Sequence, residues 1–153
     1  MPVLWAAIEC EETLNGYKVL NTPLNPILYP AIHYCTRFLC GYYDSANRRS
    51  LFVSKSDSGE DVTIATRSYN FLLLCDEENL LEWRQYQHGD LTNGRAFCVP
   101  NIGVHVYFGR TRVGNSNPIG QVCEDGFCYI PTLHYGVIKV SDFEILMYRD
   151  VEQ

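Results

Sequence analysis

The chain has 153 residues, of which 46% are hydrophobic and 20% charged, and its formal net charge is −6. This apolar fraction is too high for a disordered chain, and 11 Gly and 7 Pro are too few for a collagen-like one. The longest basic cluster is Arg48-Arg49. An acidic chain with so little clustered positive charge lacks the surface that binds a nucleic-acid backbone, so we expect no nucleic-acid partner.

Short segments rich in Val, Ile, Tyr and Phe alternate with turn residues along the chain, as expected of strands. In chain order the expected strands are Val3–Ile8, Tyr17–Leu20, Ile27–His33, Leu51–Val53, Val62–Thr66, Asn70–Leu74, Ala96–Val99, Val104–Arg110, Phe127–Ile130, Val137–Val140 and Glu144–Tyr148. Turn pairs such as Asn93-Gly94 and Asp125-Gly126 favour tight hairpins. The best helical candidate, Asp76–Trp83, is short and has no clean apolar stripe. The pattern therefore predicts an all-β domain of sandwich-like antiparallel sheets.

The N-terminal segment carries acids at Glu9, Glu11 and Glu12 and has no cationic region. Apolar runs such as Phe71–Cys75 are far shorter than the roughly 20 residues that span a bilayer. We therefore expect no membrane span, and a cytoplasmic location or release without an N-terminal signal. The seven Cys, an odd number, favour free thiols over a disulfide framework in that setting.

The second half of the chain repeats features of the first. When Trp5 is aligned with Trp83, Asn15-Gly16 meets Asn93-Gly94 and Tyr29 meets Tyr107 without a gap. With small gaps, Ser50–Val53 corresponds to Phe127–Ile130, Thr63–Thr66 to Val137–Val140, and Tyr69–Leu72 to Phe143–Leu146. We predict one domain over 1–153, with repeat one at 3–75, a connector at 76–80 and repeat two at 81–149. The two repeats are expected to share one core around a pseudo-two-fold axis, because about 75 residues bury a core poorly alone.

The second copy contains Trp83, the strand Val106–Arg110, the segment Pro118–Val122, the run Gly126–Pro131 and the closing Asp142–Leu146. This order of motifs resembles the DM-nine repeat family, and the first copy is a degenerate version of it. The resemblance implies a pseudo-symmetric all-β fold and a non-enzymatic, mannose-type carbohydrate-binding function, of the kind used in innate-immune pattern recognition. It also implies that Trp5, Trp83, Tyr29 and Tyr107 are structural repeat positions.

In the family, an Asp and a Lys near the Tyr strand are expected to hold sugar hydroxyls, and this chain departs from both positions. The Asp position falls at Thr22 in the first copy and near Pro100-Asn101 in the second, whereas the Lys position falls near Tyr43-Asp44 and at Gln121. The carbohydrate-binding candidates are Asn101, Gln121, Tyr43, Asp44 and Arg110. Amide and carboxylate groups at these positions suit sugar hydroxyls. The alternative is a protein–protein interaction module that kept the fold and lost the sugar site.

Other chemistry has weaker support in the sequence. His33 and Cys35 are close enough in sequence for a nucleophile–base pair, but alternating strand positions are the favoured explanation, and no catalytic motif is present. Cys35-x4-Cys40 and Cys123-x4-Cys128 do not fit the usual spacing of a zinc site. We expect no catalytic residues, no metal and no cofactor. The expected partner is a glycan or a protein, with a homodimer as a further possibility.

Three features have a structural and a functional interpretation. Arg110 either binds a ligand or pairs with Glu124 or Asp142. The acidic run Asp76–Glu78 is either a solvated connector or a partner-binding patch. The aromatic set Tyr34, Phe38, Tyr42 and Tyr43 forms either a wall of the core or a recognition surface.

Overall fold

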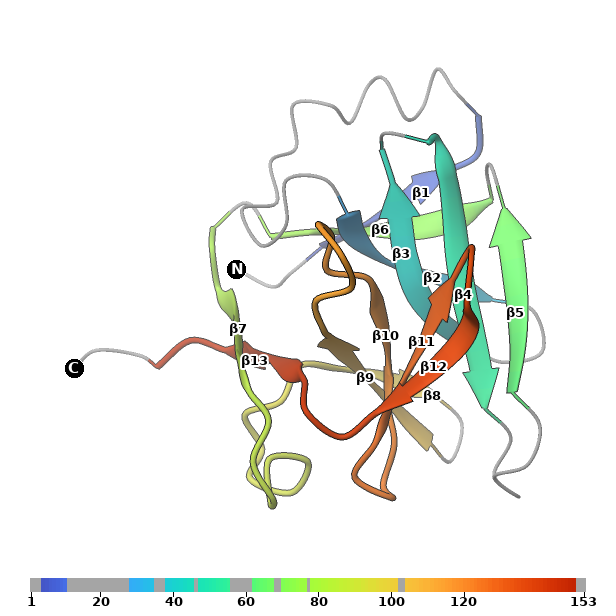
Figure 1. Cartoon of the computed structure of the whole chain (residues 1–153). Coiled ribbons are helices and arrows are strands. Elements are labelled where there is room, and N and C mark those ends of the chain that lie inside the picture. The colour runs from blue at the N-terminus through green and yellow to red at the C-terminus, as the bar shows by residue number, and fades with distance from the viewer. Residues whose placement is uncertain are drawn as a thin grey trace.

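The computed structural model describes residues 4–10, 28–34, 38–45, 47–55, 62–67, 70–76, 78–101 and 104–150. These residues form thirteen strands and no helix (Figure 1). Every strand pair is antiparallel, and the strands make two sheets. The all-β prediction is therefore confirmed. Within the described ranges, no helix has the length and apolarity that a membrane span requires.

Each sheet is built from one half of the chain. The first has the order β1-β6-β2-β3-β4-β5, from β1 (Leu4–Ile8), β2 (Leu28–Tyr34), β3 (Phe38–Asp44), β4 (Arg49–Lys55), β5 (Val62–Arg67) and β6 (Phe71–Cys75). The second has the order β12-β11-β10-β9-β13-β7, from β7 (Leu81–Gln85), β9 (Val104–Arg110), β10 (Ile119–Val122), β11 (Cys128–Thr132), β12 (Gly136–Val140) and β13 (Glu144–Tyr148). The remaining strand, β8 (Cys98–Asn101), pairs with β9.

Apart from β8, the strand order is the same in the two sheets. In each sheet, the strand that comes first in its half of the chain pairs with the strand that comes last: β1 with β6, and β7 with β13. The last strand then pairs with the first strand of a meander that contains the other strands: β6 with β2, and β13 with β9. Trp5 lies opposite Leu74 and Trp83 lies opposite Leu146, so Leu74 takes the place of Leu146 in the two halves. The predicted correspondence of Tyr69–Leu72 with Phe143–Leu146 is therefore wrong by two residues. A two-fold axis relating the two sheets stays a prediction, as does the single domain over 1–153.

A cluster of buried side chains from both sheets, which we call the shared core, fills the space between them. Its buried members are Leu28, Ile32, Cys40, Tyr42, Leu51 and Leu74 from the first half, and Leu81, Phe97, Val99, Val106, Phe108, Ile119 and Leu146 from the second. Strand residues alternate between faces, so Leu51 joins the shared core whereas Phe52 joins a separate cluster made only of first-half residues, the first-half outer cluster. A third cluster, the second-half outer cluster, is made only of second-half residues and includes Cys128, Phe143 and Ile145.

Three observed strands, β3, β7 and β10, were not among the predicted ones. Two of them contain a glycine, Gly41 in β3 and Gly120 in β10, and glycine weakens a strand pattern. A Cβ at Gly41 would overlap the carbonyl oxygen of Leu51, and one at Gly120 that of Tyr129. Both glycines therefore allow the neighbouring backbone to approach closely. The predicted strand Tyr17–Leu20 lies outside the described residues.

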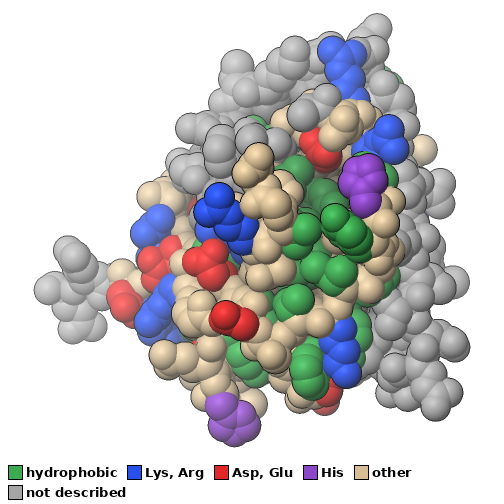
Figure 2. Space-filling view, viewed as in Figure 1, with side chains coloured by type: hydrophobic (Ala, Val, Ile, Leu, Met, Phe, Trp, Pro, Cys, Tyr) green, Lys and Arg blue, Asp and Glu red, His purple; other side chains and the backbone are tan. Residues whose placement is uncertain are grey.

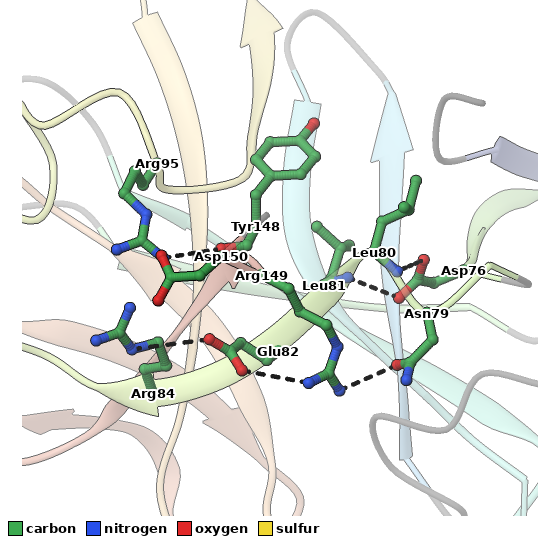
Figure 3. Close-up of polar contacts among 10 residues, drawn as sticks. All are labelled: Asp76, Asn79, Leu80, Leu81, Glu82, Arg84, Arg95, Tyr148, Arg149 and Asp150. Carbon is green, nitrogen blue, oxygen red and sulfur yellow. Dashed lines mark hydrogen bonds and ion pairs between the residues drawn. The ribbon is translucent and has the colours of Figure 1, made fainter. Parts of the chain in front are cut away.

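The connector between the halves is held by one buried carboxylate. Asp76 is 1% exposed and accepts hydrogen bonds from the backbone N–H groups of Leu80 (2.8 Å) and Leu81 (3.0 Å) (Figure 3). The solvated-connector interpretation is therefore wrong for Asp76, although Glu78 is exposed. A buried carboxylate that binds two backbone donors fixes the start of β7.

A surface network joins the same junction to the C-terminal end of β13. The guanidinium of Arg149 donates to Glu82 Oε2 (3.3 Å) and to Asn79 Oδ1 (3.1 Å), and Arg95 pairs with Asp150 (Figure 3). Exposed pairs of this kind contribute little individually. Their effect is to keep the connector and the end of β13 side by side.

Candidate functional site

A pocket of about 440 Å3 opens where the two halves meet. One wall comes from the end of β3 and the turn that follows it, and the other from the 113–118 loop and the β11–β12 turn. The lining residues are Leu28, Tyr42, Asp44, Asn47, Val113, Gly114, Ser116, Pro118, Thr132, Leu133, His134 and Tyr135. Figure 2 shows hydrophobic side chains gathered on the face where β10, β11 and β12 lie in Figure 1.

The floor of the pocket is tied to both sheets. The hydroxyl of Tyr42, on β3, donates to the carbonyl oxygen of Pro131, on β11, at 2.9 Å. Burial, with a smaller contribution from the charge of Asp44, raises the pKa of Tyr42 to about 12. The phenol therefore stays a protonated donor at neutral pH, and the two walls keep a fixed separation at this point.

Polar groups on both walls are oriented by local turns. The Asp44 carboxylate accepts from the Asn47 backbone N–H (3.3 Å) and from Asn47 Nδ2 (2.7 Å). The Thr132 hydroxyl donates to the Gly136 carbonyl (2.8 Å) and accepts from the Tyr135 N–H (3.0 Å). These bonds hold the Asp44 carboxylate and the β11–β12 turn in fixed orientations at the pocket.

The rim of the pocket is apolar and aromatic. Leu133 is 45% exposed and Tyr135 is 71% exposed, both in the β11–β12 turn. The His134 and Tyr135 rings meet edge to face, with centroids 6.4 Å apart. Exposed aromatic rings beside an acceptor are suited to binding a ligand that has both apolar and hydroxyl-bearing faces.

The five predicted carbohydrate-binding candidates do not come together. Asp44 lines the pocket, whereas Tyr43 is 5% exposed and stacks on Phe71 at a centroid distance of 5.4 Å, on the other face of the sheet. Gln121 is half-buried on β10, opposite Phe108 and Tyr129, and does not line the pocket.

Asn101 and Arg110 lie away from the pocket as well. Asn101 is the last residue of β8, opposite Val104. Arg110 Nε pairs with Glu144 Oε1 at 2.9 Å, and its guanidinium lies 4.7 Å from the ring centroid of Trp83. The structure gives Arg110 a carboxylate partner that the sequence interpretation did not name, Glu144, whereas pairing with Glu124 or Asp142 stays a prediction.

The four repeat positions pack against the hydrophobic clusters. Trp5 lies against the shared core, with its ring 6.0 Å from that of Phe108, and Trp83 also packs there. Tyr29 packs on the first-half outer cluster and Tyr107 on the second-half one. In the aromatic set, Tyr42 and Tyr43 are buried and Tyr34 is 56% exposed, so two of its members belong to the core. The side chain of Phe38 lies outside the described part.

The sequence did not indicate a second pair, Cys98 and His105. Cys98 Sγ lies 3.5 Å from His105 Nδ1, across the β8–β9 hairpin. The pair that the sequence did suggest, His33 and Cys35, stays a prediction, because Cys35 lies outside the described residues. His33 Nδ1 is 2.8 Å from the Asn70 carbonyl oxygen. Among the described residues, no group of three or more His, Cys, Asp or Glu side chains gathers to hold a metal ion.

Two buried thiols lie near the junction of the sheets. Cys40 Sγ donates to the Gly120 carbonyl at 3.1 Å, and Cys128 packs in the second-half outer cluster. Burial raises the pKa of Cys40 and of Cys128 well above 9.0, and neighbouring Cys123 raises both further. These thiols are therefore neutral structural groups and not nucleophiles.

The raised pKa values give an expected alkaline limit of stability. Below about pH 9 the Cys40, Cys128 and Tyr42 groups are protonated in both the folded and the unfolded chain, so their contribution is constant. Above that pH the unfolded chain ionises first, so the free energy of unfolding falls. Melting temperatures measured from pH 7 to 11 should drop above about pH 9 and recover on return to pH 7. A melting temperature that holds to pH 11 would contradict this.

No family model matches the chain, and neither a curated protein nor a solved structure matches it. The resemblance to the DM-nine repeat family therefore stays an interpretation of the sequence.

Proposed function

We propose that the chain is a non-enzymatic carbohydrate-binding protein that takes a mannose-type sugar in the pocket between its two halves. The observation that carries the proposal is the combination of the Asp44 carboxylate and the exposed Tyr135 ring on opposite walls of one pocket. Its volume of about 440 Å3 falls within the roughly 300–1,000 Å3 of small-molecule sites.

The chemistry of a sugar matches these two groups. Neighbouring hydroxyls donate to a carboxylate, and charge-assisted hydrogen bonds are the stronger kind. The C–H face of the ring packs on an aromatic side chain such as Tyr135. Because hydroxyl recognition competes with water, a single site binds weakly, and we expect useful avidity only with several sites on one target. A pattern-recognition role, in the cytoplasm or after release without an N-terminal signal, rests on this binding.

Two variants test the site by calorimetry with mannose, after a glycan array has identified the best ligand. Asp44→Asn keeps the shape of the side chain and removes its charge, so we expect at least about a tenfold loss of affinity, as for a hydrogen bond to a charged group. Tyr135→Ala should cause a similar loss, without changing the melting temperature, because the ring is exposed.

Matched controls separate the pocket from general surface effects. Glu124→Gln removes a charge from an exposed turn outside the pocket, and Tyr34→Ala removes an exposed ring from the end of β2. Both should bind as the unmodified chain does. The proposal fails if no array ligand or mannose gives heat at millimolar concentration, or if the controls lose as much affinity as the pocket variants.

One observation favours the alternative, a protein–protein interaction module. Leu133 and Tyr135 are both exposed in a single turn, and Tyr is one of the residue types that most often anchor protein interfaces. Under this alternative, a pull-down would give one stoichiometric protein partner that Leu133→Ala and Tyr135→Ala both release, whereas Asp44→Asn would retain it. Glycan binding would be absent.

A further inference from the structure

The Cys98–His105 pair lies at the outer face of the β8–β9 hairpin. The register places Cys98 opposite Tyr107 and Pro100 opposite His105, so the Cys98 and His105 side chains are diagonal neighbours on one face. His105 is exposed and Cys98 is half-buried, so solvent and ions reach both. The His105 ring lies beside the Tyr107 ring, with centroids 6.2 Å apart.

The separation of the two donor atoms suits a tetrahedral metal ion. Zinc binds thiolate sulfur at about 2.3 Å and imidazole nitrogen at about 2.0–2.1 Å, so two such ligands of one tetrahedron lie about 3.5 Å apart. Cys98 Sγ and His105 Nδ1 are already 3.5 Å apart. Thiolate and imidazole are also the ligand types that zinc takes in preference to the hard oxygen ligands of magnesium or calcium.

The chain supplies only half of a closed site. No third His, Cys, Asp or Glu of the described residues joins the pair, whereas a structural zinc site needs four ligands. The Cys98 and His105 side chains share one face of the hairpin, and His105 is exposed there. A second copy docked on this face about a two-fold axis would bring an identical Cys/His pair to it, because a two-fold contact uses the same surface twice.

We propose that Cys98 and His105 bind a zinc ion that is shared with the same two residues of a second copy of the chain, so that zinc links a homodimer. Each thiol releases its proton to solvent as its S–Zn bond forms, and each imidazole donates the Nδ1 lone pair and keeps a proton on Nε2. No electron transfer is involved. Zinc competes with a proton for the thiolate, so its affinity should rise with pH.

Cobalt and zinc titrations of the full, EDTA-treated chain in reducing buffer test this proposal. We expect a near-ultraviolet thiolate-to-cobalt band with tetrahedral visible bands, lost on zinc addition. The expected saturation is one metal per two chains. Analytical ultracentrifugation should show a dimer with zinc and a monomer after EDTA.

Four variants assign the ligands. Cys98→Ser and His105→Ala should each weaken metal affinity at least about tenfold and abolish the zinc-dependent dimer, whereas Cys10→Ser and His88→Ala should change neither. His105 is exposed, so His105→Ala decides the outcome even if Cys98→Ser fails to fold. The proposal is overturned by a chain that binds no zinc at micromolar concentration, by one zinc per chain with no change in mass, or by zinc binding that survives both ligand variants. In the first case Cys98 and His105 form only a hydrogen bond. Sugar binding at the pocket is independent of every one of these outcomes.

Discussion

Replacing Gly120 with alanine should destabilise the protein by more than about 3 kcal/mol, the upper end of the usual cost of overpacking. The added Cβ would overlap the carbonyl oxygen of Tyr129 and approach the Cα of Ile130, both on the neighbouring strand β11. Backbone atoms cannot rotate away as a side chain can, so β10 and β11 would have to separate. Gly41→Ala should have a similar effect, because its Cβ would overlap the carbonyl oxygen of Leu51.

Gly114→Ala is the matched control for this clash. Gly114 has a φ of 60°, and a Cβ there would have no atom within 4 Å. Its substitution should cost only about 1 kcal/mol, the strain of a left-handed conformation. Urea unfolding monitored by circular dichroism gives the three free energies. If Gly114→Ala and Gly120→Ala lowered the free energy of unfolding equally, this would contradict the close approach of β10 and β11.

Replacing Phe108 with alanine should cost about 3–5 kcal/mol, as usual for a large cavity at a fully buried aromatic residue. Phe108 is on β9 in the second half, and its ring lies 6.0 Å from Trp5, on β1 in the first half. The cavity would therefore open between the two sheets and weaken both. Tyr135→Ala, at an exposed position, should change the free energy of unfolding by no more than about 0.5 kcal/mol.

The two tryptophans make the shared core directly measurable, because each half contains one. Trp83→Phe leaves Trp5 to report on the first sheet, and Trp5→Phe leaves Trp83 to report on the second. If the sheets unfold as one unit, Phe108→Ala should lower the urea midpoint equally in both single-tryptophan backgrounds. Separate midpoints, with only the second sheet destabilised, would contradict the predicted single domain.

Most strands could be predicted from the sequence because they follow a simple composition rule: a short segment rich in Val, Ile, Tyr and Phe lies between turn residues. Segments such as Val104–Arg110 and Glu144–Tyr148 were predicted with the bounds that β9 and β13 have. The rule failed at β3 and β10, where Gly41 and Gly120 interrupt the apolar run. In these strands the glycine is required by a close approach of the neighbouring strand, which composition alone does not reveal.

The candidate site was harder to predict, because it depends on which strand face meets the other half. Tyr43 and Asp44 are adjacent in sequence, yet one is buried in the first-half outer cluster and the other lines the pocket. The opposite wall comes from residues about 90 positions later, in the β11–β12 turn. The Cys98–His105 pair was within reach of the sequence, since both segments were predicted strands and only their register was needed.

A crystal structure of the chain soaked with mannose tests the central proposal most directly, because it locates the ligand as well as detecting it. We expect density for the sugar in the pocket between the halves, with hydroxyls within hydrogen-bond distance of the Asp44 carboxylate and the ring against Tyr135. The same soak with Asp44→Asn crystals should leave the pocket without sugar. Ordered sugar at another place on the surface, with nothing between Asp44 and Tyr135, would contradict the account.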